Sequence, residues 1–384
     1  MGVTQATHQI PVENMDVPLV KSGANNAIAH ITSNEFVFKA LQDGVVDAVL
    51  PNKRARLKYK DGSVDYISLE QINTRSRDGF YVNINMELDK KVKKGMKFKA
   101  NDILAADRHF FNIDGNDTSL FHGTFAKVAI TTMNNSYEDS SVISQKIADK
   151  MTTSITMMTV VSLGKGDNIE KLIKIGTPVN TNDPLVVFEK ALEADTSTME
   201  LLSKLGDELQ EEIEKGGKNA LLSKYTGIVT DIRVHRNYEV EEYSPSLKKM
   251  ITEYDKKYKA EANAVADIRD DRFLPFHFVG INETGRSRSE QFDGVLIEFM
   301  ITIKDKMKPG DKMSLSLALK NIAAETIVYG EEPYTNHRPE DTIDFILSPM
   351  SLVSRQVPDQ HMQMFTNKVM YELNMQVKEL AKKG

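Results

Sequence analysis

The stretch VAITTMNNSYEDSSVISQKIADKM, residues 128–151, combines the two periodic patterns from which the fold can be inferred. Its first five residues are apolar or β-branched, which is typical of a buried strand. A set of apolar residues at helical spacing then predicts a helix: Val142, Ile143, Ile147 and Met151. The acids Glu138 and Asp139 stand between the two patterns and are therefore expected at or near the start of the helix.

These carboxylates have two interpretations that the residues alone leave open. A carboxylate at a helix start commonly accepts a backbone N–H group and complements the helix dipole. Alternatively, the pair belongs to a site with Lys312 and Lys320, which follow a Lys-Pro-Gly-Asp turn, and with Arg355. Two acids, two lysines and an arginine suit the handling of a triphosphate and its metal, because charge neutralisation is most of that catalysis.

The chain before this stretch is predicted to be rich in strands. Residues 44–50 read as a strand that stops at a proline, and residues 54–60 alternate strictly between charged and apolar side chains. The alternation places four cations on one face: Arg54, Arg56, Lys58 and Lys60. They are interpreted either as a solvated edge strand protected by charge or as a basic strip that faces phosphates.

The chain after it changes character between residues 164 and 304. Short strands and tight turns predict a small β domain with protruding helices. One helix begins at a capping box at 197–200, and another carries an apolar stripe over residues 247–258. Residues 295–303 alternate as a strand. The last helix has an apolar stripe that must dock on its own core or on a partner chain: Met362, Phe365, Val369, Leu373, Val377 and Leu380.

Composition excludes several classes of protein. The 384 residues include no cysteine, which excludes disulfide frameworks, thiolate zinc sites and cysteine nucleophiles. The net charge of −6 argues against a dominant arginine-rich nucleic-acid arm but allows a local basic face. No run of 18 apolar residues is present, so no membrane span is expected. The common phosphate-binding glycine loops, a nucleophile elbow and an acidic metal loop are also missing.

Three motifs, taken in order, resemble one protein family. The sequence SYEDSSVIS at 136–144 is similar to Gly-Tyr-Asn-Phe-Glu-Asp-Ala/Ser-Ile-Leu-Ile/Val-Ser, KPGDKM at 308–313 is followed by Lys320 at the family's spacing, and IDFILSP at 343–349 leads to Arg355. In this order they resemble the C-terminal half of the β subunit of multisubunit, DNA-dependent RNA polymerase. The start of the chain and its glycine-containing turns resemble the same subunit colinearly.

The resemblance implies roles for the charged residues. Asp139, with Glu138 beside it, would reach a second magnesium and the incoming triphosphate. Lys312 and Lys320 would contact the RNA 3′ end and the substrate phosphates, and Arg355 would reach the triphosphate. The Mg²⁺ would be held mainly by the partner β′ chain and the nucleotide, so this chain would supply half a site and no zinc ligand. The activity implied is that of a DNA-directed RNA polymerase, a nucleotidyltransferase, within a multichain complex.

The resemblance also implies a domain organisation. The fold class is α+β and β-rich, with a double-psi β-barrel in the hybrid-binding region. Residues 1–164 would be the first part of that region, 165–304 the flap or wall with a flap-tip-like helix at 197–215, 305–357 the second part, and 358–384 the docking helix. Implied partners are an N-terminal β fragment, the β′ chain or its fragments, an initiation factor, the DNA template, the RNA–DNA hybrid and nucleoside triphosphates, with no membrane.

The departures from the family pattern shape the remaining hypotheses. Residues 314–319 replace a glycine-containing loop, which leaves the backbone geometry there open. The truncated length resembles the split subunits of large bacteriophages, which implies the host cytoplasm or a virion as location. The alternative is a polymerase-derived scaffold or RNA-binding module without catalysis, which the loop departures favour. A third hypothesis is an unrelated soluble β-rich enzyme.

Overall fold

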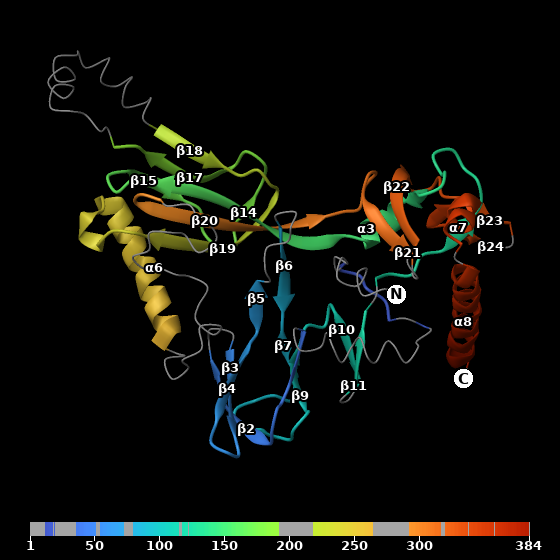
Figure 1. Ribbon diagram of the computed structural model, residues 1–384, viewed down its shortest axis with the longest axis horizontal. Coiled ribbons are helices and arrows are strands. Elements are labelled where there is room, and N and C mark those ends of the chain that lie inside the picture. Colours follow the sequence, from blue (N-terminus) through green and yellow to red (C-terminus); the bar gives the residue numbers. More distant parts are fainter. Residues whose placement is uncertain are drawn as a thin grey trace, which may run out of the picture.

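The computed structural model consists mainly of strands, arranged in several sheets, with a few helices (Figure 1). It describes the following residues: 12–17, 19, 36–50, 54–72, 80–114, 117–121, 123–191, 218–263, 292–315, 319–336, 338–356 and 358–383. Strands dominate this described part, so the expectation of a β-rich α+β fold is confirmed. The flap-tip-like helix expected at 197–215 lies outside the described residues.

The longest strands form a six-stranded antiparallel sheet across the upper half of Figure 1. Its order is β16 (Pro178–Val179), β19 (Gly227–Arg236), β20 (Val295–Asp305), β14 (Thr153–Leu163), β6 (Phe80–Asn85) and β5 (Glu70–Ile72). β14 and β20 pair along their whole length, from Thr153 opposite Asp305 to Leu163 opposite Val295. This sheet therefore pairs a strand that ends at residue 163 with a strand that begins only at residue 295.

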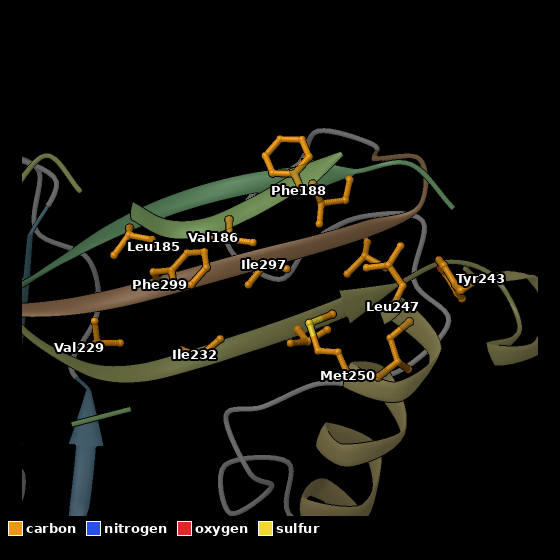
Figure 2. Packing of buried hydrophobic residues seen from close by; sticks show 14 of the residues in the cluster. Leu185, Val186, Phe188, Val229, Ile232, Tyr243, Leu247, Met250, Ile297 and Phe299 are labelled. Atoms are coloured by element: carbon orange, nitrogen blue, oxygen red, sulfur yellow. The ribbon is translucent and has the colours of Figure 1, made fainter. Parts of the chain in front are cut away.

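The main apolar core lies between this sheet, a smaller sheet and helix α6. The smaller sheet has the order β15 (Asn168–Leu172), β17 (Pro184–Glu189) and β18 (Lys218–Leu222), and α6 spans Pro245–Asn263 after the short helix η1 (Val240–Glu242). Figure 2 shows side chains of β17, β19, β20 and α6 meeting in this core. Leu247 and Ile251 are fully buried, as the apolar stripe predicts.

Strand β20 departs from the expected alternation because both of its faces are buried. Leu296, Glu298 and Met300 lie on the second face and are as inaccessible as the residues of the main core. Glu298 is only 1% exposed, and its Oε2 lies 3.2 Å from Nε2 of His235, which is equally buried. A buried carboxylate is tolerated when it has such a partner.

The N-terminal strands form a separate group in the lower half of Figure 1. One sheet has the order β4 (Val64–Ser68), β3 (Arg54–Tyr59), β2 (Gly44–Leu50) and β8 (Lys97–Phe98), and a second has the order β1 (Val37–Lys39), β9 (Ile103–Ala106) and β7 (Glu87–Leu88). The hairpin of β10 (Phe111–Asp114) and β11 (Asp117–Leu120) follows them. A second apolar core fills this group.

Strand β3 confirms the predicted alternation but is not an edge strand. Ala55, Leu57 and Tyr59 are buried in the second core, while Lys58 is exposed. However, β3 is hydrogen-bonded to β2 on one side and to β4 on the other. The charges of this strand therefore cannot serve to protect a free edge.

A five-stranded mixed sheet at the right of Figure 1 brings distant motifs together. Its order is β12 (Val128–Ile130), β25 (Phe345–Leu347), β13 (Ser140–Ser144), β22 (Leu319–Ile327) and β21 (Lys312–Leu315). β12 runs parallel to β25, and β13 runs parallel to β22. Helices α3 (Gln145–Lys150) and α7 (Pro349–Arg355) connect to this sheet.

Strand β13 corrects the prediction of a helix directly after Asp139. Residues 140–144 pair with β22 on one side and with β25 on the other, so the acid pair precedes a strand. The helix begins only after Ser144, whose Oγ accepts a hydrogen bond from Ile147 N at 3.1 Å. Val142 and Ile143 are both fully buried, because β13 is an internal strand covered on both faces.

The last helix, α8 (Pro358–Lys383), is confirmed, but no other part of the described chain covers its apolar stripe. The exposed fractions along the stripe are 69% for Met362, 70% for Phe365, 43% for Val369, 49% for Leu373, 61% for Val377 and 68% for Leu380. Glu372 on another side of α8 bonds Arg338 of β24 (Arg338–Thr342), which pairs with β23 (Tyr334–Thr335). The boundaries given above for the domains stay a prediction.

Candidate functional site

The centre of the candidate site is an ion pair between Asp139 and Arg355, which are 216 residues apart in the sequence. Nε of Arg355 donates to Oδ1 of Asp139 at 3.1 Å, and a terminal nitrogen of the same guanidinium bonds Oδ2. Such a bidentate ion pair fixes the orientation of both side chains. The exposed fractions of the two side chains are 44% for Arg355 and 46% for Asp139, so the pair remains open to a ligand.

Helix α7 places Arg355 by means of a short, well-capped structure. The Oγ of Ser348 accepts from Met350 N at 3.3 Å, and a proline occupies the first turn. Leu352 points into the apolar cluster beneath the five-stranded sheet. The helix then ends after two turns, because Gln356 adopts a left-handed conformation with φ 51°. Arg355 is thus held at the end of a short helix that is anchored at both ends.

The turn before β13 places Asp139. Asn135 and Glu138 both have positive φ, 65° and 47°, a conformation that L residues rarely adopt. The Oγ of Ser140 donates to the carbonyl of Tyr137 at 2.7 Å and accepts from its N–H at 2.9 Å. This network aims Asp139 at α7 while Glu138 is exposed, with no side-chain partner among the described residues. Backbone strain of this kind is found disproportionately at functional sites.

Lys312 and Lys320 lie on the hairpin of β21 and β22, and both are exposed. Lys312 is directly opposite Ile322, and Ser314 is directly opposite Lys320. Residues opposite each other in an antiparallel pair share a face, so both lysines project from the same face, roughly 7–8 Å apart as diagonal neighbours. The connection at 316–318 lies outside the described residues, so the geometry of that loop stays open.

The Lys-Pro-Gly-Asp turn anchors this hairpin. Asp311 accepts from Lys308 N at 3.0 Å through its carboxylate, and its own N–H donates to the carbonyl of Lys308 at 3.1 Å. Gly310 has φ 98° and donates its N–H to Ala323 O at 2.7 Å. Glycine adopts this conformation without strain, which explains the residue at this position.

A backbone hydrogen bond joins the acid turn to the lysine hairpin. Ile322 N donates to the carbonyl of Asp139 at 2.8 Å, and Ser140 is paired with Ile322. Since β13 and β22 are parallel, Asp139 and Lys320 lie near the ends at which these two strands begin. The structure therefore brings Asp139 and Arg355 into contact and places both lysines on the adjacent hairpin.

The candidate site has three cations, Lys312, Lys320 and Arg355, and two carboxylates, Glu138 and Asp139. The hydrogen bonds to Asp139 raise the pKa of Arg355 above its ordinary value, so this side chain stays charged. Among the described residues, no group of three or more histidine, aspartate or glutamate side chains could hold a metal ion. Asp139 and Glu138 could supply only part of the six oxygen ligands that Mg²⁺ prefers. The site has the composition of a phosphate-binding surface that is incomplete as a metal site.

Sequence reasoning missed the buried pair of His235 and Glu298. The only signal was a glutamate inside the apolar run VLIEFMI at 295–301, because a lone charge in such a run requires a buried partner. This pair lies on β19 and β20, in the sheet drawn apart from α7 in Figure 1. It belongs to the packing of that sheet.

Comparison with known proteins adds one match. A family model described as RNA polymerase Rpb2, domain 6, matches residues 39–381, a span that includes all five charged residues of the candidate site. A search of curated proteins finds no match. Among the helices of the described ranges, none is long and apolar enough to cross a membrane.

Proposed function

Because the chain belongs to the RNA polymerase Rpb2 domain 6 family, as a segment of the β subunit of a multisubunit polymerase, we propose that it forms part of a nucleotidyl-transfer site shared with another chain. The observation that carries this proposal is the contact of Arg355 with Asp139, formed across 216 residues beside the hairpin of Lys312 and Lys320. These four charges come from three separate segments that adjoin the five-stranded sheet. Surface ion pairs alone do not require such an arrangement.

The proposed chemistry follows from the types of these charges. A guanidinium presents a planar fork that binds two phosphate oxygens, and Asp139 holds that fork in one orientation. The two lysines are point charges on a neighbouring face and are suited to a nucleotide phosphate and to the RNA 3′ end. Glu138 stands beside Asp139 and is free to reach toward a metal. Together they bind and orient the triphosphate and offset the negative charge that develops during transfer.

Magnesium would supply the remaining charge neutralisation and would activate the 3′ hydroxyl. The donor set of this chain fits one contact to the metal that accompanies the triphosphate, through Asp139 with Glu138 beside it. The other ligands would come from the nucleotide and from the β′ chain. For this reason the proposed site is a half-site, completed at a subunit interface.

The finer assignments rest on the same resemblance. We propose that the residues on either side of the middle region build the hybrid-binding region with its double-psi barrel, and that 165–304 form the flap over the RNA exit channel. Proposed partners are an N-terminal β fragment, the β′ chain, an initiation factor, template DNA and the RNA–DNA hybrid. We also propose that the chain is a split subunit of a large bacteriophage, acting in the host cytoplasm or carried in the virion.

Helix α8 supports the proposal of a partner chain. Its apolar stripe is exposed over its whole length, from Met362 at 69% to Leu380 at 68%. Monomeric proteins rarely expose a continuous apolar surface of this kind. We therefore expect another polymerase chain to cover the stripe, as an apolar helix face buried at a subunit interface.

The second candidate function is a scaffold or RNA-binding module without catalysis. It is favoured by the residues at 314–319, which contain no glycine where the family has a glycine-containing loop. Both hypotheses predict binding of partner chains and nucleic acid. They differ in whether the charged residues change the rate of nucleotide incorporation.

The test is alanine substitution in the assembled complex. Asp139→Ala, Lys320→Ala and Arg355→Ala should each lower the rate of nucleotide incorporation, by about 100-fold or more where a transition-state contact is lost. Lys218→Ala is the matched control, since it breaks an exposed ion pair with Glu170 at 2.7 Å in a different sheet. Unchanged rates in all three site variants would support the scaffold. The isolated chain should neither incorporate nucleotides nor bind magnesium tightly, and activity from this chain alone would contradict the half-site.

A further inference from the structure

A second basic surface lies on the N-terminal group of strands. The sequence KKVKKGMKFK at residues 90–99 contains six lysines and no acid, although the whole chain has a net charge of −6. All six lysines are exposed, and none of them forms an ion pair with another described residue: Lys90, Lys91, Lys93, Lys94, Lys97 and Lys99. Six ammonium groups in ten residues create a local positive potential that attracts anions, although the whole chain is acidic.

The backbone of this segment is held in a defined shape. Val92 N donates to Asp89 O at 2.8 Å, and Met96 N donates to Lys93 O at 3.0 Å, which closes two successive turns. Val46 of β2 bonds this segment twice, accepting from Gly95 at 2.8 Å and donating to Met96 at 2.9 Å. The lysines are therefore presented by a structured loop, which lowers the entropic cost of placing them against a partner.

The register of the sheet adds Lys58 to this surface. Lys58 on β3 is opposite Val45 on β2, and Val45 is opposite Lys97 on β8. The three side chains share one face, and Lys58 and Lys97 lie about 10 Å apart, two strand spacings. On the opposite face, Tyr59 and Phe98 pack edge to face with ring centroids 6.0 Å apart. We call Lys58 and the six lysines of residues 90–99 the lysine surface.

Three carboxylates lie beside the two ends of this segment. Asp89 accepts a hydrogen bond from Lys91 N at 3.0 Å, Asp102 accepts one from Lys99 N at 2.8 Å, and Asp43 accepts one from Ala100 N at 3.0 Å. Asp43 bonds Lys60 at 2.6 Å, and Asp47 bonds Arg56 at 3.2 Å. Thus two cations of the alternating residues 54–60, Arg56 and Lys60, are paired within the chain, which weakens the interpretation of these residues as a phosphate-facing strip. At the centre of the lysine surface, Lys58, Lys93, Lys94 and Lys97 are exposed and form no ion pair with another described residue.

We propose that the lysine surface binds the phosphate backbone of duplex DNA. An interface with an acidic protein is less suited to it, because protein interfaces have an apolar core and are depleted in lysine. Here Val92 and Phe98 are 9% and 4% exposed, so the surface between the lysines offers little apolar contact. Proteins that bind single-stranded nucleic acid stack its bases on exposed aromatic side chains. The nearby aromatic residues Tyr59 and Phe98 lie on the opposite face of the sheet and are buried.

The lysine surface is separate from the candidate active site. In Figure 1, β2, β3 and β9 lie at the bottom of the molecule, whereas β21, β22 and α7 lie at the upper right. The proposal therefore adds a second contact with nucleic acid, outside the site of nucleotidyl transfer. Only the choice of DNA rests on the proposed function, and the binding itself needs no catalysis.

The experiment measures the affinity of the full-length chain for a fluorescently labelled 20-base-pair duplex DNA of arbitrary sequence as salt is varied. The variant Lys93→Gln/Lys94→Gln/Lys97→Gln should bind at least about tenfold more weakly at low salt. Its slope of log affinity against log salt should fall by roughly 2–3, since each phosphate contact contributes about 0.9. The control Lys249→Gln/Lys256→Gln/Lys257→Gln changes the net charge equally at exposed positions of α6 and should bind like the parent chain.

The outcomes separate the possible partners. An equal loss of DNA affinity in both triple variants would mean that only the net charge of the chain matters, and this result would overturn the proposal. Stronger binding to a single strand of the same length, or displacement of the labelled duplex by polyglutamate but not by unlabelled duplex DNA, would also overturn it. Because the readout is binding by the chain itself, it is independent of whether Asp139, Lys320 and Arg355 affect incorporation.

Discussion

At the scale of single residues, the pair of Asp139 and Arg355 is a poor source of stability. Both side chains are nearly half exposed, and exposed ion pairs typically contribute about 0–1 kcal/mol. The turn that aims Asp139 also contains Glu138 at φ 47°, a conformation that costs free energy. A strained turn that forms a weak surface pair suits a binding role better than a structural one.

The substitution Arg355→Lys tests this interpretation. Lysine keeps the positive charge but loses the planar fork that bonds both carboxylate oxygens. We expect the free energy of unfolding, measured with urea, to change by no more than about 1 kcal/mol. In the assembled complex, nucleotide incorporation should fall by about tenfold or more, with a higher KM for the nucleotide. A large loss of stability with normal incorporation would instead assign the pair a structural role.

At the scale of elements, α7 is the part on which the site depends. This helix has only 7 residues, yet it carries Arg355 and closes over the apolar cluster that contains Ile143 and Leu352. Isolated helices of such length are unstable in water, so its caps and packing must hold it. Ser348, which is 1% exposed, supplies the N-terminal cap.

Removal of that cap should therefore affect both stability and activity. Ser348→Ala is expected to lower the free energy of unfolding by about 0.5–2 kcal/mol, because Met350 N loses its acceptor. Ser348→Thr is the matched control, since threonine keeps the hydroxyl and should retain most of the stability. Urea unfolding of both variants measures the difference, and equal stability of the alanine and threonine variants would argue against a cap at this position.

At the scale of the whole molecule, hydrogen bonds join segments that are distant in the sequence. Asp149 of α3 accepts from Tyr329 Oη at 2.7 Å and pairs with Lys306 Nζ at 3.0 Å. Together with Gln145, these contacts lower the pKa of Asp149 to about 2, the bond from Tyr329 being the largest cause. The carboxylate thus links α3 to the segments on either side of the lysine hairpin.

The contribution of Asp149 to the free energy of unfolding depends on pH in a predictable direction. The pKa of Asp149 is lower in the folded state than the ordinary value of 3.8, so its contribution is complete above about pH 4 and is lost as the pH falls toward 2. Asp149→Asn should be less stable than the parent chain at pH 7 and should lose less stability between pH 4 and pH 2. Tyr329→Phe should show a smaller change in the same direction. Denaturant unfolding at stepped pH measures both, and parallel pH profiles for parent and Asn variant would contradict the linkage.

Much of the fold could be predicted from local patterns, and the errors have physical causes. The alternation over residues 55–60 and the apolar stripe at Leu247, Met250 and Ile251 each reflect one buried face, and both are confirmed. The spacing of residues 142 and 143 from Ile147 fits a helix and predicts one there. In the structure they form an internal strand, since a strand covered on both faces shows no alternation. The same reason explains the buried Glu298 within β20.

The sequence by itself determined the β-rich character of this protein, its apolar stripes and the order of its motifs, because these patterns arise over a few neighbouring residues. The tertiary structure decided which of those residues meet. Arg355 reaches Asp139 only because β25 pairs with β13 and delivers α7 beside the acid turn. The lysine surface likewise includes Lys58 only through the register of β3, β2 and β8. Contacts across such separations depend on strand pairing, which local periodicity does not specify.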